Sequence, residues 1–342
     1  MLLMRYYILT PFLILSLTVN AKTKIEKNDS LGTMSYAVNS QNKYIYSRPK
    51  PFEFITVLPR DYSDFTKKVF RKEQFLNLAL ITSSTAILIA YDQQILDAAK
   101  HFGSAIHLKG TSNQTSLFKE SVKIANKEIP IEFNVPTDLN SSFYFIGDGW
   151  VHTTFAFAYW INGLITNDYR SLRTASEIGE CIFTSGLATQ IIKHITGRES
   201  PYTTNVPGGV WRFFPNQKRY ADGTPHYDAF PTGHLATAMA TVTVIADNYS
   251  EVKYIRPIGY TLMTLLGFSM LNNGVHWAGD YPLGIAMGYV FAKVAVHRGR
   301  KIELESNTTS LENHWKFSPS FSMVPNEYGI GLGVKWNMVK RR

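Results

Sequence analysis

Residues 230–249 read FPTGHLATAMATVTVIADNY, a stretch in which a proline and a glycine introduce an alanine-rich run. The run predicts a helix over 233–249, with Thr232 as its N-cap. Gly233 lets a ligand approach the amides of the first turn, where a helix N-terminus binds anions. His234 can present its imidazole to the same anion. An ordinary capped helix with an exposed histidine is the alternative.

Apolar periodicity predicts five further helices around this one. Their expected bounds are 74–99, 149–166, 175–196, 254–272 and 281–297. A long connection precedes 233–249 and contains clustered prolines and glycines: Pro201, Pro207, Gly208, Gly209 and Pro215. Six helices with such a connection indicate a mainly α fold, a six-helix bundle within a helical domain of residues 74–300.

The segments on either side of the bundle have other patterns. Residues 22–73 are polar and contain Pro49, Pro51 and Pro59, which predicts an irregular N-terminal strap. In the extension 301–342, apolar and polar residues alternate before and after a turn at residues 325–327, and this period of two predicts a C-terminal β-hairpin. A lone hairpin is marginally stable, so we expect it to pack on the bundle or on a partner.

The first 21 residues resemble a secretory signal peptide. A short basic region precedes an apolar stretch over 8–19, and small residues stand before Lys22. An uncleaved anchor is the alternative, although the apolar stretch is shorter than the ~20 residues of a span. We therefore expect an exported protein, periplasmic or associated with a membrane. Residues 75–91 carry no charge and could be either a membrane anchor or a buried core helix.

The composition excludes some functions. With 45% hydrophobic and 18% charged residues the chain is a folded protein, and its net charge of +9 suits anionic lipids or phosphorylated substrates. No basic run is interleaved with aromatic residues, apart from the basic end of the chain at 340–342, so nucleic acid is not the expected partner. The single cysteine, Cys181, lies in an apolar run and is expected to be a buried, inert thiol.

Two more segments carry reactive side chains near helix ends. Residues 193–201 read KHITGRESP and place cations where a helix stops, which by itself only complements the helix dipole. Residues 274–280 read GVHWAGD, in which His276 and Asp280 are one helical turn apart. A carboxylate on one ring nitrogen fixes the tautomer and leaves the other nitrogen free to attack. A structural hydrogen bond, or a metal site completed by His226 and Asp228, is the alternative.

Together the three segments, in this order, resemble the motifs of the type 2 phosphatidic acid phosphatase superfamily over residues 175–298. Those motifs are Lys, six residues, Arg-Pro; Pro-Ser-Gly-His; and Ser-Arg, five residues, His, three residues, Asp. The matching residues are Lys193, Pro201, Pro231, Gly233, His234, Ser269, His276 and Asp280. Three positions depart from the motifs: Ser200 and Met270 replace the two arginines, and Thr232 replaces the serine.

The resemblance implies a role for each residue. His276 would attack phosphorus to form a phosphohistidine, Asp280 would orient it, and His234 would protonate the leaving oxygen and later activate water. The phosphoryl oxygens would be held by Lys193, Thr232, Gly233 and Ser269. Arg198, two residues before the missing arginine, is expected to replace one clamp. The resemblance implies neither a metal nor another cofactor.

The expected function is hydrolysis of a phosphate monoester or pyrophosphate outside the cytoplasm. Export and basic charge favour a phosphorylated lipid as the substrate, with small soluble phosphoesters as the other class. Lipid A, undecaprenyl pyrophosphate and phosphatidylglycerol phosphate all fit this description. A non-catalytic protein that binds phosphate or a lipid phosphate, in which the missing arginines reflect lost turnover, is the alternative. A vanadate haloperoxidase is disfavoured, because vanadate needs a highly charged cradle.

Overall fold

The computed structural model describes residues 25–28, 31–124, 127–304, 315–326 and 329–340. The predicted signal peptide lies outside these residues. The chain divides into two compact units between Glu303 and Leu304, and each unit is described by itself.

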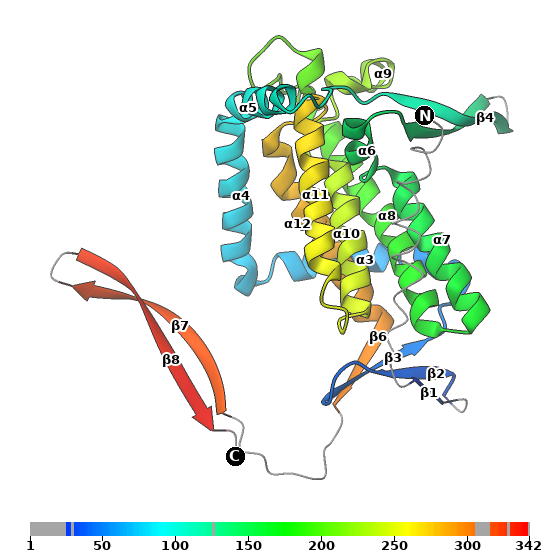
Figure 1. The fold of residues 1–342 in the computed structure, drawn as a ribbon, viewed down its shortest axis with the longest axis vertical. Coiled ribbons are helices and arrows are strands. Elements are labelled where there is room, and N and C mark those ends of the chain that lie inside the picture. Colours follow the sequence, from blue (N-terminus) through cyan, green and yellow to red (C-terminus); the bar gives the residue numbers. More distant parts are fainter. Residues whose placement is uncertain (1–24, 29–30, 125–126, 305–314, 327–328, 341–342) are drawn as a thin grey trace. The chain divides into compact units, whose positions relative to one another are not determined.

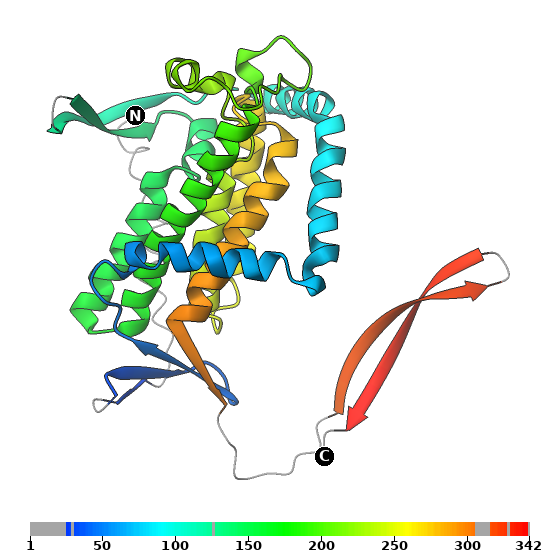
Figure 2. The same ribbon diagram turned by 180° about the vertical axis from the view of Figure 1, so that it is seen from behind.

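The first unit is mainly helical, as predicted, and its long helices run side by side (Figures 1 and 2). They are α7 (Gly149–Thr166), α8 (Tyr169–Thr196), α10 (Gly233–Asn248), α11 (Ile255–Asn272) and α12 (Tyr281–Gly299). Helix α8 begins six residues before its predicted start, because Asp168 caps it and accepts hydrogen bonds from the backbone N–H groups of Arg170 and Ser171.

The predicted helix 74–99 is divided in two. A 3-10 turn (Lys72–Gln74) leads into α4 (Phe75–Ala90), and α5 (Asp92–Ala105) follows after a break at Tyr91. Figure 1 shows α4 upright beside the bundle and α5 lying across the bundle end. No residue of α4 is buried, and Lys72–Ala90 is the one helix of the described chain that is long and apolar enough to cross a membrane. The alternative of a buried core helix is therefore wrong.

The prediction of an irregular strap over 22–73 is also wrong. This segment forms β1 (Ile25–Asn28), β2 (Thr33–Ala37), β3 (Asn42–Ser47), α2 (Glu53–Thr56) and α3 (Leu58–Val69). The strands make an antiparallel sheet, which β6 (Arg300–Leu304) completes in the order β1-β2-β3-β6. Pro59 lies in the first turn of α3, where the missing N–H costs nothing, so it begins a helix and does not break one.

Two hairpins and two short helices complete the description. The hairpin of β4 (Gln114–Ile124) and β5 (Lys127–Pro136) was not predicted from the sequence. The strands β7 (Trp315–Asn326) and β8 (Gly329–Lys340) form the predicted C-terminal hairpin. Helices α6 (Leu139–Phe145) and α9 (Gln217–Asp222) lie near one end of the bundle (Figure 1).

Helix α10 lies in the core and is alanine-rich because its neighbours approach closely. A Cβ atom on Gly288 of α12 would come within 2.0 Å of the Ala236 carbonyl oxygen. Tight packing of α10 against α12 thus fixes the direction in which the start of α10 points.

Helix α8 carries acidic residues into the same core. Glu180 is hydrogen-bonded to Arg298, and Glu177 accepts a hydrogen bond from Asn248 at 2.5 Å. Burial raises the pKa of Glu177 to about 7. Pairing of this kind lets a charged helix occupy the centre of the bundle.

Candidate active site

Four helix ends meet at one end of the bundle and bring the three sequence motifs together. Lys193 lies in the last turn of α8, and His234 lies in the first turn of α10. His276 lies in the link between α11 and a 3-10 turn (Ala278–Asp280) that leads into α12. The site is therefore formed by residues far apart in the sequence.

His276 is buried and its ring is held by a backbone carbonyl. Its Nδ1 lies 2.7 Å from the Ala229 carbonyl oxygen and 3.4 Å from Oδ2 of Asp280. A carbonyl oxygen only accepts, so Nδ1 must carry the proton. This tautomer leaves a lone pair on Nε2, which is the state that a nucleophilic imidazole needs.

Asp280 is fully buried and is held from three sides. Its Oδ2 accepts the backbone N–H of Trp277 at 2.8 Å, and its Oδ1 accepts from NH1 of Arg198 at 2.6 Å. Its third contact is the longer one to His276. The Asp280 carboxylate thus holds the loop that carries His276, and it also faces the His276 ring.

Arg198 does not lie in an anion cradle, contrary to the prediction that it replaces a phosphate clamp. Its side chain has no exposed surface. It pairs with Asp280 and Asp92, and NH2 donates to the Gly208 carbonyl at 3.0 Å. Two buried carboxylates hold the guanidinium because an unpaired charge in the core would be costly. Arg198 positions Asp280.

Asp92 is a site residue that the sequence analysis missed. Besides pairing with Arg198, its Oδ1 accepts the backbone N–H of Gly279 at 2.8 Å, one residue before Asp280. Burial raises its pKa, which Arg198 opposes. The sequence contains one indication of this residue, an acidic side chain directly after the charge-free run 75–91. Its partner Arg198 is 106 residues away, so the pairing itself could not be predicted.

His234 faces His276 across the site, with ring centroids 5.9 Å apart and planes at 71°. The ring of His234 also packs against Tyr144 of α6, with centroids 4.8 Å apart. Burial, and then the neighbouring His276 and Lys193, lower the pKa of His234 well below its usual value. Gly147 is required beside it, because a Cβ there would lie 2.7 Å from Cβ of His234.

Lys193 is largely buried and points toward the same space. Its Nζ lies 3.6 Å from Oδ2 of Asp228, whose side chain is 27% exposed. A cation with one partly exposed partner can exchange it for a phosphoryl oxygen. Lys193 therefore remains a candidate for anion binding.

Two predicted phosphate-binding groups are engaged elsewhere. The Thr232 amide donates to the Asp280 carbonyl at 3.1 Å, and its hydroxyl caps α10 by accepting from the Leu235 N–H. The Ser269 hydroxyl donates to the Asn140 carbonyl at 2.8 Å. Both residues are fully buried and stabilise the fold around the site. Thr232 thus forms the predicted cap, but its amide is not free to bind phosphate.

Gly233 retains its predicted place. It opens α10, and only the Thr189 hydroxyl would lie near an added Cβ, at 3.7 Å. The first amides of a helix have no acceptor within the helix, so those of Gly233 and His234 can bind an anion.

The positions without arginine are filled by uncharged, buried side chains. Met270 belongs to an apolar cluster with Leu235 and Leu266, and its sulfur lies 3.8 Å from the Thr232 hydroxyl. Ser200 is 2% exposed, and its N–H donates to the Pro225 carbonyl. The cradle thus has fewer cations than the motifs specify.

The two residues considered as further metal ligands have other partners. Nδ1 of His226 lies 2.8 Å from Oε1 of Glu199. The Asp228 carboxylate faces Lys193. These contacts do not direct either side chain toward a metal shared with His276 and Asp280.

A family model of the PAP2 superfamily matches residues 174–303. This region is therefore similar to the PAP2 superfamily. The matched residues include most of α8 and all of α10, α11 and α12, and the three motifs lie at the ends of these helices and in the links between them. The match confirms the resemblance to the type 2 phosphatidic acid phosphatases.

One curated relative supports the same family. A stretch of 74 residues, 21% of this chain, is 35% identical to a lipid A 1-phosphatase of Porphyromonas gingivalis. The chain covers 16% of that relative's length. No solved structure matches the chain.

Proposed function

We propose that the PAP2 domain is a phosphatase that hydrolyses a phosphate monoester or pyrophosphate through a phosphohistidine at His276. The observation that carries the proposal is the hydrogen bond from Nδ1 of His276 to the Ala229 carbonyl. In the neutral ring this hydrogen bond leaves the lone pair on Nε2, at the residue that the resemblance makes the nucleophile.

In the first step Nε2 of His276 attacks phosphorus, and the bond to the leaving oxygen breaks. His234, across the site, donates its proton to that oxygen. Lys193 and the first amides of α10 neutralise the charge that develops on the phosphoryl oxygens. In the second step neutral His234 takes a proton from water, which attacks phosphorus and releases phosphate and free His276.

Asp280 stabilises the positive charge that the phosphorylated ring acquires. Arg198 and Asp92 keep that carboxylate in place. The Arg198 guanidinium, 2.6 Å from Oδ1, compensates the charge of this buried carboxylate. The arrangement favours catalysis over simple phosphate binding, because binding alone needs no oriented imidazole.

We propose a lipid-linked substrate and an active site facing the periplasm. The exposed, apolar helix α4 suits a membrane anchor. Helix α5, which follows it, begins at Asp92, and Asp92 contacts Arg198 and Gly279 beside the proposed catalytic residues. The similarity to a lipid A 1-phosphatase favours lipid A over the other phospholipids.

A phosphate-release screen tests the proposal. Substrates are lipid A, undecaprenyl pyrophosphate, phosphatidylglycerol phosphate and soluble aryl phosphates, with the His276→Ala protein as the blank. We expect release above the blank for at least one lipid. Binding of phosphate without release from any of them would favour the non-catalytic alternative.

A further inference from the structure

A pocket rich in basic side chains lies at the far end of α10 from the proposed catalytic residues. Its cavity volume is about 630 Å³, within the range of about 300–1,000 Å³ that is usual for small-molecule sites. Helix α3, in blue, lies across α12 beside it (Figure 2), with the ring centroids of Phe65 and Phe291 4.2 Å apart. The charged side chains that line this basic pocket are Lys68, Asp247, Lys293, Arg300 and Lys301.

The basic pocket is separate from the candidate active site. Helix α10 begins beside His276 with Gly233 and His234, and Asp247 is its second-last residue. At about 1.5 Å per residue, Asp247 lies roughly 20 Å along α10 from His234. An anion in the basic pocket is therefore out of reach of the catalytic histidines.

Four cations face a single carboxylate in the basic pocket. Both oxygens of that carboxylate are engaged: Oδ2 of Asp247 accepts from Nζ of Lys293 at 2.6 Å, and Oδ1 accepts from Arg256 at 2.5 Å. Arg300 donates to the backbone carbonyl of Asp247. Within the described part of the chain, the side chain of Lys68 forms no hydrogen bond or ion pair. The basic pocket thus has more positive charge than Asp247 can balance.

Lys68 is held among other cations. It is partly buried on α3, and burial, followed by the neighbouring Lys293 and Arg71, lowers its pKa, which Asp247 opposes. A multiply charged anion between Lys68 and Lys293 would stabilise both ammonium groups. A phosphate group suits this position, because it is compact and offers several oxygens to lysine point charges.

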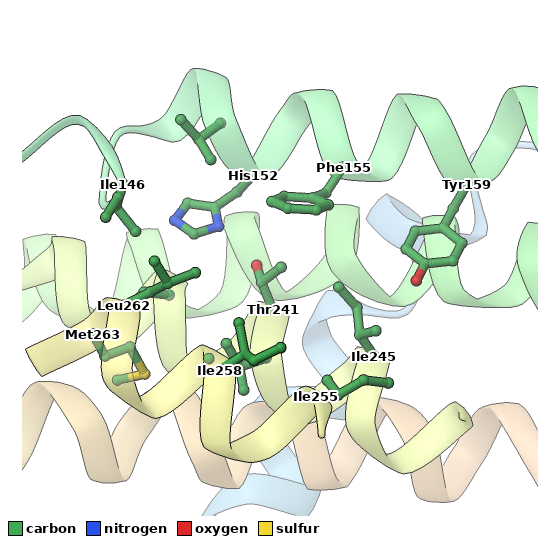
Figure 3. A pocket seen from close by; sticks show the side chains of 14 residues that line it. Ile146, His152, Phe155, Tyr159, Thr241, Ile245, Ile255, Ile258, Leu262 and Met263 are labelled. Carbon is green, nitrogen blue, oxygen red and sulfur yellow. The ribbon is translucent and has the colours of Figure 1, made fainter. Parts of the chain in front are cut away.

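The apolar cavity between α7, α10 and α11 is unsuited to such an anion. Its volume is about 60 Å³, and uncharged side chains line it (Figure 3). His152 points into this cavity, but burial lowers the pKa of His152 to about 4, so the ring is uncharged at neutral pH. The cations of the basic pocket offer the better anion site.

We propose that the basic pocket binds a phosphate group, as a second anion site that is distinct from the one at His276. Lys68, Lys293 and Lys301 provide the positive charge for the phosphoryl oxygens. The inference does not rest on the proposed phosphatase activity, because none of these lysines lies near the catalytic histidines.

The phosphate group can belong to a lipid headgroup or to a soluble anion. Residues 67–72 read KKVFRK, and the exposed, apolar helix α4 begins at Phe75. A polybasic segment beside a membrane helix attracts anionic lipids. The headgroup of an anionic phospholipid is therefore the favoured source.

Calorimetric titration of pyrophosphate into the His276→Ala protein tests the proposal, since this protein lacks the proposed nucleophile. Lys68→Gln, added to it, should weaken one class of pyrophosphate site about tenfold, because it removes a charged hydrogen-bond donor. Lys67→Gln is the matched control: Lys67 is the neighbour of Lys68 on α3, its side chain is 71% exposed and it does not line the basic pocket. It should leave that class unchanged.

Lys193→Met separates the two anion sites. It should leave the class of site that depends on Lys68 unchanged, even if the proposed function fails and His276 never becomes phosphorylated. Equal affinities in Lys68→Gln and Lys67→Gln would overturn the proposal. Loss of the same class of site in Lys193→Met would also overturn it, because the anion would then lie at the catalytic residues.

Thermal melting shows whether Lys68 has only a structural role. Without pyrophosphate, Lys68→Gln should melt at or above the temperature of its parent, since it removes a cation that Lys293 and Arg71 repel. With saturating pyrophosphate the parent should melt at the higher temperature, because the ligand stabilises it more. A variant that melts below its parent by the same amount in both conditions would contradict the proposal.

Dihexanoyl phosphatidylglycerol, used below its critical micelle concentration, distinguishes the two sources of phosphate. If it displaces pyrophosphate from the class of site that depends on Lys68, the basic pocket binds a lipid headgroup. If pyrophosphate binds there and is not displaced, the ligand is a soluble phosphate. Absence of any pyrophosphate site that depends on Lys68 would overturn both forms of the proposal.

Discussion

Replacing Arg198 with methionine should destabilise the protein strongly, because it removes the charge between two buried carboxylates. Opposite charges about 4 Å apart attract by about 4 kcal/mol at an effective dielectric constant of about 20. Arg198 makes two such contacts, to Asp92 and Asp280, and all three side chains are fully buried. We expect the free energy of unfolding at pH 7 to fall by about 3–5 kcal/mol.

The loss should depend on pH in a defined direction. Without Arg198, the pKa of Asp92, already raised by burial, rises further in the folded state. A carboxyl whose folded-state pKa exceeds its unfolded value destabilises the fold when ionised, and this penalty disappears as pH falls through the folded-state pKa. The difference between variant and parent should therefore be smaller at pH 5 than at pH 7.

Urea unfolding followed by tryptophan fluorescence measures this, since Trp211 and Trp277 flank the guanidinium at 4.7 and 5.4 Å. Arg212→Met is the control, because Arg212 is 37% exposed and its contact with Glu199 is 3.4 Å. That change should cost under about 1 kcal/mol. Equal stability of the two variants, or a loss that grows toward acid pH, would refute the reasoning.

Three further predictions concern residues at motif positions. Lys193→Met removes a positive charge near His234 and so raises the pKa of His234. The alkaline limb of the pH profile of kcat/KM should therefore move to higher pH. Lys193→Arg keeps the charge and should leave that limb in place. Ser269→Ala should lower the free energy of unfolding by about 1 kcal/mol and leave the inhibition constant of phosphate unchanged. A higher inhibition constant, which means weaker binding of phosphate, would restore the phosphate-binding role of Ser269. Met270→Arg should lower the melting temperature without increasing turnover, because the side chain is buried among apolar residues; a faster enzyme would contradict this placement.

The helices were predicted well where the periodic apolar pattern continued over many residues and where the residues at the helix ends were typical caps. Helix α7 has its predicted bounds. Lys193 at the end of α8, His234 at the start of α10, and His276 and Asp280 between α11 and α12 lie at the same end of the bundle. The sheet that joins β6 to β1–β3 was not predicted, because its strands are short and residues 48–299 separate β6 from the other three strands.

The sequence identified the reactive residues of the candidate site but did not predict which groups they contact. The motifs identified His276, His234 and Asp280, yet the Ala229 carbonyl holds His276 more closely than Asp280 does. Arg198 was assigned to the anion because only its sequence position was known. Its partner Asp92 comes from another helix, and no local pattern connects the two.

The central claim is that His276 becomes phosphorylated. The intact protein, His276→Ala and His234→Ala are each mixed with a radiolabelled aryl phosphate and quenched rapidly without acid. The label that remains on each protein measures the phosphohistidine. We expect label on the intact protein and none on His276→Ala. His234→Ala should accumulate label, because an aryl leaving group needs little acid assistance while hydrolysis still needs the base. Label on His276→Ala, or no label on the intact protein while phosphate is released, would contradict the account.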